Sequence, residues 1–261
     1  AQAGNVRSTF LRFNMQIIEA TAGVAGAFKL NVAFYEAHGQ DGISALSETI
    51  RYIRSIAPET PVILDAKRAD IGNTNRGYAQ AAFDDFRADA VTVNPLFGGE
   101  ALSPFLDRAG KGIIVLCRTS NPGAKEFQGR IVHISDEEAE RWGLERKTTL
   151  PLYQLVAWRV SREWYKNGNC ALVVGATCPE ELAEVRKIVG DGFPILIPGI
   201  GKQGGDLAAA VRAGKDGRSQ GMVINSSSAI IFASKGQDFA EAAGREARKL
   251  HEAIQQHLKE G

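Results

Sequence analysis

The sequence predicts a (β/α)8 TIM barrel, and three observations support this fold class. Short apolar runs rich in Val, Ile and Leu alternate with helical segments along the 261 residues, which is the order of parallel βαβ units. Polar or glycine-rich residues follow nearly every apolar run, as expected when all strand ends share one rim. A doubly wound open sheet, the alternative, would concentrate its site at one switch point. The length also suits a barrel, so we predict one domain over residues 1–261.

Seven strands can be assigned, whereas a barrel needs eight. The predicted strands cover residues 26–30, 61–67, 89–95, 112–120, 170–177, 193–201 and 221–227. The main predicted helices cover residues 43–57, 75–87, 179–190, 206–214 and 237–260. A further helix, predicted over residues 8–23 with Ser8 as its cap, opens the pattern, and the strand that should precede it is not evident. Residues 121–150 form the longest irregular segment, for which a mobile cover over the rim and a plain surface excursion are both open.

Composition excludes several classes of protein. The net charge of +1 gives no general attraction to nucleic acid or to a membrane. We find no apolar stretch long enough for a transmembrane helix and no apolar core of a signal peptide at the N-terminus. The cysteines Cys117, Cys170 and Cys178 are few and lie in or near apolar runs, so we expect reduced thiols in a cytoplasmic protein. The four histidines are scattered, which argues against a zinc site.

The strand at residues 61–67 ends in an unusual cluster of charges. Because side chains alternate across a strand, Asp65 and Lys67 share one face, while Leu64 and Ala66 share the other. If the apolar face packs on the helices, both charged side chains point into the mouth of the barrel. A salt bridge that closes the top of the barrel is the purely structural explanation, and for an isolated pair it is as good as a functional one.

The preceding strand adds a third charge to this group. Lys29 lies on the face of residues 26–30 that matches Asp65, which predicts a plus-minus-plus row of Lys29, Asp65 and Lys67. Asp70 lies beyond the strand and could reach back or reach across a subunit boundary. Several buried charges are expensive to desolvate and seldom stabilise a fold by themselves. They indicate a preorganised electrostatic site.

These residues resemble a known family. The stretch "LDAKRADIGNT" is similar to the Asp-x-Lys-x-x-Asp signature of the orotidine 5′-phosphate decarboxylases. The blocks "FKLNVAFYEAHG", "VTVNPLFGGEALSPF", "VLCRTSNPG", "LVVGAT" and "LIPGIGKQGGD" resemble the stand-alone bacterial branch, and the similarity runs from about residue 9 to residue 233. It implies a homodimeric (β/α)8 barrel that converts orotidine 5′-phosphate to UMP, the last step of de novo pyrimidine synthesis, with no metal or organic cofactor.

The resemblance also implies roles for individual residues. Lys29, Asp65, Lys67 and Asp70 match the catalytic tetrad of the family, in which Lys67 stabilises and then protonates a carbanion at C6. Asp70 and Thr74 would be contributed across the dimer interface. The substrate-binding positions that match are Thr74, Ser120, Pro198, Gln203 and Gly204.

The glycine-rich stretch at residues 198–206 also predicts an anion site from its residues alone. Backbone N–H groups of such a turn can hold a phosphate, and barrels often bind phosphate at the loops after strands seven and eight. A plain turn with Asp206 as the helix cap is an equally good explanation.

The sequence departs from the family at two points. The family's opening strand, with its ribose-binding aspartate, has no counterpart before residue 8. Ser228 stands where the family usually has an arginine that grips the phosphate, which predicts weaker phosphate binding. Lys202 and Arg218 are candidate substitutes for that arginine.

Two alternatives to the decarboxylase are open. The first is a Mg²⁺-dependent phosphosugar decarboxylase of the same superfamily, in which a glutamate takes the position of Lys29. The second is a barrel that binds its ligand without turnover, which the two departures would explain and the intact charged row argues against.

Overall fold

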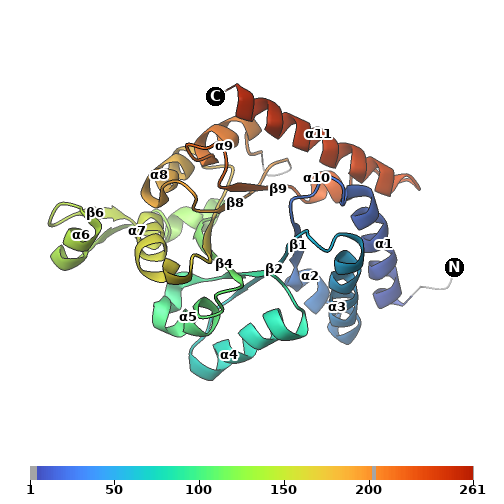
Figure 1. Ribbon diagram of the computed structural model, residues 1–261, viewed down its shortest axis with the longest axis horizontal. Coiled ribbons are helices and arrows are strands. Elements are labelled where there is room, and N and C mark those ends of the chain that lie inside the picture. The colour runs from blue at the N-terminus through green and yellow to red at the C-terminus, as the bar shows by residue number, and fades with distance from the viewer. Residues whose placement is uncertain (1–4, 202–203, 261) are drawn as a thin grey trace.

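The protein is built on a curled parallel sheet with helices on its outer face, seen in a computed structural model that describes residues 5–201 and 204–260 (Figure 1). Seven strands pair in the order β1-β2-β3-β4-β7-β8-β9. They are β1 (Phe28–Asn31), β2 (Val62–Arg68), β3 (Ala90–Val93), β4 (Gly112–Arg118), β7 (Cys170–Val174), β8 (Ile195–Pro198) and β9 (Met222–Asn225). All seven predicted strands are therefore confirmed, in the order that a barrel requires.

A helix precedes β1, and further helices lie between the strands of the parallel sheet and after the last one. They are α1 (Val6–Thr21), α2 (Val32–Glu36), α3 (Gly39–Ile56), α4 (Gly72–Gln80), α5 (Gly98–Leu106), α6 (Asp136–Trp142), α7 (Leu152–Arg159), α8 (Pro179–Val189), α9 (Leu207–Gly214), α10 (Ser228–Ile231) and α11 (Phe239–Lys259). Within the two described ranges, no helix is both long and apolar enough to cross a membrane. The predicted cap of α1 was wrong: the side chain of Asn5, and not that of Ser8, accepts the hydrogen bond from the N–H of Arg7.

Two apolar cores show which side chains of each strand point inside the curled sheet and which point toward the helices. Inside the curled sheet, a small cluster contains one buried residue from each of five strands: Ile63, Ala90, Ile114, Val173 and Leu196. The larger core lies between the sheet and the helices and contains the alternate positions, among them Val62 and Leu64. Asp65 therefore belongs to the inner face, as strand alternation predicted.

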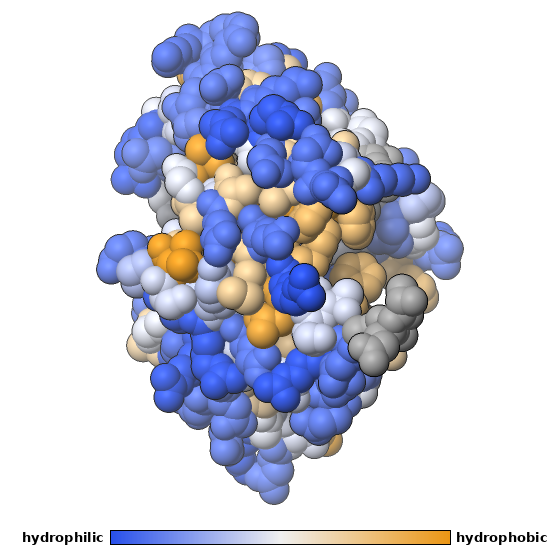
Figure 2. All heavy atoms as spheres, turned by 90° about the vertical axis from the view of Figure 1, so that its right-hand side faces the viewer, coloured by the Kyte–Doolittle hydropathy of each residue, from blue (hydrophilic) through white to orange (hydrophobic). Residues whose placement is uncertain are grey.

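The sheet is open between β9 and β1 in the part of the chain that the structure describes. The eighth strand that the barrel count requires is not found there. The helix layer nevertheless continues across this opening, because α1 packs on α11. A Cβ atom at Gly244 would lie only 2.8 Å from the carbonyl oxygen of Ala20, so glycine permits this close approach. Figure 2 views this side of the molecule, where hydrophobic residues are visible between hydrophilic ones.

The irregular segment after β4 is a folded excursion. Two short antiparallel strands, β5 (Ile131–His133) and β6 (Thr149–Pro151), flank α6, and a small core of their own includes stacked Trp142 and Trp158. Figure 1 shows this unit projecting outward at the left of the ring of helices. The unit from β5 to β6 lies outside the ring of helices, which favours a surface excursion for residues 131–151.

Candidate active site

The charged side chains of β1 and β2 meet at the C-terminal edge of the sheet. The register pairs Lys29 with Ile63 and Asn31 with Asp65, so the two strands place their charged residues at neighbouring heights. Lys29 Nζ lies 2.7 Å from Asp65 Oδ2, and Lys67 Nζ lies 2.6 Å from Asp65 Oδ1. The plus-minus-plus row is therefore present, with one carboxylate held between two ammonium groups.

The electrostatics of Asp65 follow from this arrangement. Burial alone would raise the pKa of Asp65, because desolvation disfavours the charged form. The charge of Lys29 and the hydrogen bonds from Lys29 and Lys67 outweigh it and hold that pKa below its ordinary value. The side chain of Lys67 is 48 % exposed, whereas that of Lys29 is 14 % exposed. Lys29 thus anchors the carboxylate, and Lys67 is the member of the row that a substrate can reach.

Thr92, which the sequence analysis did not single out, completes the environment of this carboxylate. Its hydroxyl donates to Asp65 Oδ1 at 2.9 Å and accepts the N–H of Lys67 at 2.9 Å. In the sequence, this role was indicated by a single threonine at an inward-facing position of the otherwise apolar run "AVTV".

The fourth predicted member of the tetrad is not joined to the other three within one chain. Asp70 accepts the N–H of Ile71 at 2.7 Å and makes no ion pair with any described residue. Thr74 is exposed in the first turn of α4. Asn75, also missed from the sequence, is fully buried and ties this corner down, because its Nδ2 donates to the carbonyl oxygens of Asp70 and Ala101.

Ser120 lies where the ends of β4 and β7 come together. A Cβ atom at Gly175 would be only 2.7 Å from the Cβ of Ser120, so the glycine lets the two strand ends approach. The hydroxyl of Thr177 donates to the carbonyl oxygen of Ser120 at 3.2 Å. The side chain of Gln128 accepts the N–H of Thr119 at 2.8 Å and so closes the loop that contains Ser120. These contacts fix Ser120 at the same edge of the sheet as Lys67.

The predicted phosphate end is built from the loops after β8 and β9. Pro198 is the last residue of β8 and pairs with Asn225 of β9. Gly204 has a φ of +78° and donates its N–H to the carbonyl oxygen of Gly201 at 2.9 Å. Gln203 and Lys202 lie outside the described residues.

The two loops are in contact, and one suggested substitute for the arginine is eliminated. A Cβ at Gly201 would lie 3.0 Å from the Cβ of Ala229, next to Ser228 at the start of α10. Asp206 caps α9 by accepting the N–H of Ala209. Arg218 pairs with Asp216 in the loop before β9, at the opposite end of the strand from Ser228, so it cannot replace the arginine.

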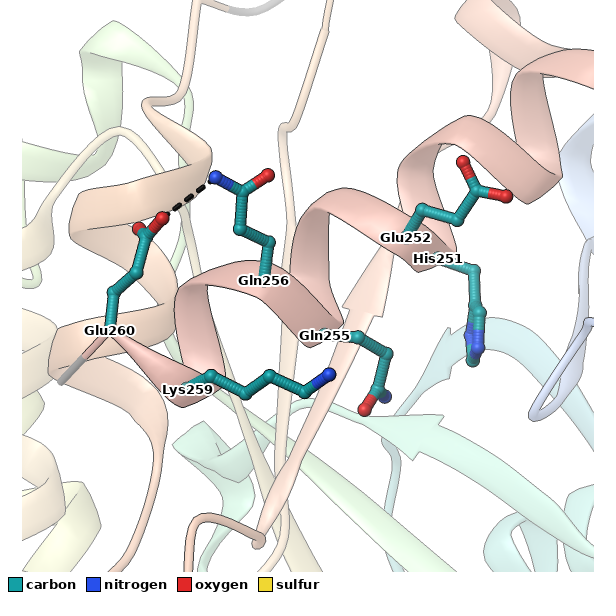
Figure 3. Close-up of a pocket in the computed structure, with 6 residues that line it drawn as sticks. All are labelled: His251, Glu252, Gln255, Gln256, Lys259 and Glu260. Atoms are coloured by element: carbon teal, nitrogen blue, oxygen red, sulfur yellow. Dashed lines mark hydrogen bonds between the residues drawn. The ribbon is translucent and has the colours of Figure 1, made fainter.

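A separate hollow of about 430 Å³ lies on α11 and is not part of this site (Figure 3). Five of its lining residues come from that one helix and the sixth is its C-cap, Glu260; the five are His251, Glu252, Gln255, Gln256 and Lys259. No second element supplies converging groups, so the charged edge of the sheet is the better candidate. Among the residues that the structure describes, no three His, Cys, Asp or Glu side chains are grouped as metal ligands.

Comparisons with known proteins find similarity over most of the chain. The profile of the orotidine 5′-phosphate decarboxylase / HUMPS family matches residues 11–243. A protein of Bordetella pertussis named orotidine 5′-phosphate decarboxylase is 45% identical over 244 residues, which are 93% of this chain and 83% of that protein. The structure of Leishmania donovani OMP decarboxylase has a TM-score of 0.79 at 35% identity, covering 97% of this chain and 90% of that one.

A longer protein also contains this fold. The structure of Leishmania donovani UMP synthase has a TM-score of 0.82 at 37% identity, and the match covers 97% of this chain but only 51% of that protein. The profile spans most of the residues, and the identity to curated relatives holds over almost the same region. The chain belongs to the orotidine 5′-phosphate decarboxylase / HUMPS family.

Proposed function

We propose that this protein decarboxylates orotidine 5′-phosphate to UMP in pyrimidine synthesis, and that the row of Lys29, Asp65 and Lys67 performs the reaction. The single observation that carries the proposal is this row, in which a half-exposed ammonium is held 2.6 Å from a buried carboxylate. The names of the relatives identify the same substrate.

The residue types suit the chemistry of this reaction. When the bond between C6 and the carboxylate breaks, CO₂ leaves and the electron pair stays on C6, where the pyrimidine ring offers no ordinary electron sink. The Lys67 ammonium stabilises the developing negative charge because it is fixed before the reaction starts. It then donates its proton to C6, which forms the C–H bond of UMP. Asp65 and Lys29 keep that ammonium in place.

We also propose which residues bind the rest of the substrate. Ser120 meets the edge of the pyrimidine, and Thr74 lies toward the ribose. Pro198, Gln203 and Gly204, in the loop after β8, bind the phosphate. The position of Pro198 and Gly204 supports this assignment, since the loop after β8 lies at the C-terminal edge of the sheet, where barrels often bind phosphate. Phosphate binding, remote from C6, supplies energy to orient the ring over Lys67.

An assay of the purified chain with orotidine 5′-phosphate, with and without EDTA, tests this function. We expect UMP to form at the same rate in both. The Mg²⁺-dependent alternative predicts loss of turnover in EDTA, and it is disfavoured because Lys29 puts a positive charge 2.7 Å from the carboxylate that a cation would need. Binding of UMP without any turnover would support the binding-only barrel instead.

A homodimer is the second part of the proposal. Four large apolar side chains, each more than half exposed, follow three neighbouring strands: Phe34 after β1, Ile71 after β2, and Leu96 and Phe97 after β3. They flank Asp70, which makes no ion pair within its own chain among the described residues. A two-fold contact through these four apolar side chains would bury them. It would also bring Asp70 and Thr74 toward the partner's Lys67.

Subunit complementation tests the shared site. Asp70→Ala and Lys67→Ala should each be inactive alone, whereas mixing them should restore about a quarter of the wild-type activity, because half of the dimers are mixed and each has one intact site. The matched control mixes Lys67→Ala with Asp65→Ala, which damages the same half-site and should restore nothing. If mixed dimers of the first pair are shown to form and stay inactive, the shared site is wrong.

The serine at the phosphate end gives a gain-of-function prediction. Ser228→Arg should raise kcat/KM roughly tenfold or more, mainly through KM, because a charge-assisted hydrogen bond contributes about 1.5–3 kcal/mol. Ser228→Lys offers a comparison that adds charge without the planar guanidinium. Unchanged KM in Ser228→Arg would mean that the phosphate is held by other groups.

Two coarser features complete the proposal. We assign residues 1–261 to one domain, because the seven parallel strands belong to one sheet. We also assign the protein to the cytoplasm. The three cysteines are free and buried, and unpaired thiols suit a reducing compartment.

A further inference from the structure

The backbone at Lys67 is irregular, and the irregularity is confined to the reacting end of β2. Leu64 pairs with Val91 on β3, but the next pair joins Arg68 to Val93, so four steps along β2 match two along β3. Lys67 has a φ of +50°, in the left-handed region that disfavours residues with a side chain. A bulge of this kind re-aims a side chain and is frequent beside active sites.

The hydroxyl of Thr92 makes hydrogen bonds to two residues at this bulge, Lys67 and Asp65. Thr92 on β3 is 1 % exposed, and its Oγ1 accepts the N–H of Lys67, which the bulge removes from regular strand pairing. The same Oγ1 donates to Asp65 Oδ1, the oxygen that also receives Lys67 Nζ. The Thr92 hydroxyl therefore donates one hydrogen bond to Asp65 and accepts one from the backbone of Lys67.

A role in packing alone does not explain a threonine here. The inner face of the sheet below it is apolar, with Ala90 one layer down on the same strand. Valine has nearly the shape of threonine and would fit such a layer without burying a hydroxyl. The hydroxyl is satisfied only by contacts to Asp65 and Lys67, so its presence is tied to those two residues.

We propose that Thr92 is a positioning residue, whose hydroxyl locks the left-handed backbone of Lys67 and the rotation of the Asp65 carboxylate so that the Lys67 ammonium is aimed at the substrate. Without the hydroxyl, the N–H of Lys67 loses its partner, and Asp65 Oδ1 keeps only the flexible ammonium of Lys67 of the two groups that hold it. The ammonium then samples several directions, which lowers the fraction of bound substrate that is correctly aligned. This inference rests on the proposed decarboxylation for its kinetic readout.

The test compares Thr92→Val, which keeps the shape, with Thr92→Ser, which keeps the hydroxyl. We expect Thr92→Val to lower kcat by 10- to 100-fold with KM changed less than threefold, and Thr92→Ser to stay within about fivefold of the wild type. Assays run well below the unfolding midpoint of each variant, so a loss of stability is not counted as a loss of rate. A kcat for Thr92→Val within threefold of the wild type, or equal losses in both variants, would overturn the proposal.

Crystal structures of the two variants provide a readout that does not need turnover. In Thr92→Val, we expect Lys67 to leave the left-handed region and its Nζ to move out of hydrogen-bond distance of Asp65, while Thr92→Ser keeps both features. Unchanged geometry at Lys67 in Thr92→Val overturns the inference, whatever the activity. An inactive wild-type protein would instead contradict the proposed function, and the structural comparison would still decide the role of Thr92.

Discussion

Replacing Lys67 with alanine is expected to lower kcat/KM for orotidine 5′-phosphate by at least about 10⁴-fold. The substitution removes two contributions at once, since in the proposed mechanism the same ammonium stabilises the carbanion and supplies the proton. A positioned general acid typically contributes about 10²–10⁴-fold, and a fixed electrostatic contact about 10²–10³-fold. Binding of UMP should persist, because the residues that we propose for the phosphate and the pyrimidine lie at other strand ends.

The neighbouring residue provides the matched control for this variant. Arg68 is the next residue of β2, carries the same charge, and pairs with Glu36 on α2 and not with Asp65. Arg68→Ala should keep kcat within about tenfold of the wild type. If the two variants lost activity equally, the inward orientation of Lys67 would not be what matters.

Asp65→Asn should impair both rate and stability. The amide keeps the shape but leaves Lys29 and Lys67 without a negative partner, and we expect kcat/KM to fall by about 10³-fold. Removing one partner of a buried ion pair lowers the free energy of unfolding by about 3–5 kcal/mol. We expect a loss of about 3 kcal/mol here, because the side chain of Lys67 is partly exposed. Asp107→Asn, at an exposed carboxylate, should change neither quantity.

The stability difference should depend on pH in a defined direction. The pKa of Asp65 is lower in the folded protein than in the unfolded chain, so the unfolded chain binds more protons between the two values. The contribution of Asp65 is therefore complete above pH of about 4 and is lost as the pH falls through the folded-state pKa. Denaturant unfolding of wild type and Asp65→Asn between pH 7 and pH 3 should converge. A constant difference would mean that the charge of Asp65 does not stabilise the fold.

The sequence predicted the strands well because each is a continuous apolar run that ends in polar residues. Strand alternation was then enough to place Asp65 on the inner face beside Lys29, and the structure confirms both positions. The open position between β9 and β1 was predicted for the same reason, since strands of this kind can be counted.

Other features depend on contacts that no local pattern encodes. The bulge at Lys67 arises from the pairing of β2 with β3, so neither the left-handed φ nor the role of Thr92 could be predicted from one strand alone. The strands β5 and β6 have three residues each, which is too short for a periodic signal, although their side chains help to form a separate core. Asp70 was assigned from the resemblance, and its partner lies beyond a single chain in the proposed dimer.

We propose that Lys67 delivers the proton that replaces CO₂ at C6. The most direct measurement is mass spectrometry of UMP formed from orotidine 5′-phosphate in D₂O by the wild-type protein and by Lys67→Ala. We predict that the wild type produces UMP with a single deuterium at C6 and that Lys67→Ala produces no detectable UMP within the same reaction time. Deuterated UMP formed at a similar rate by Lys67→Ala, or no UMP from the wild type, would contradict the account.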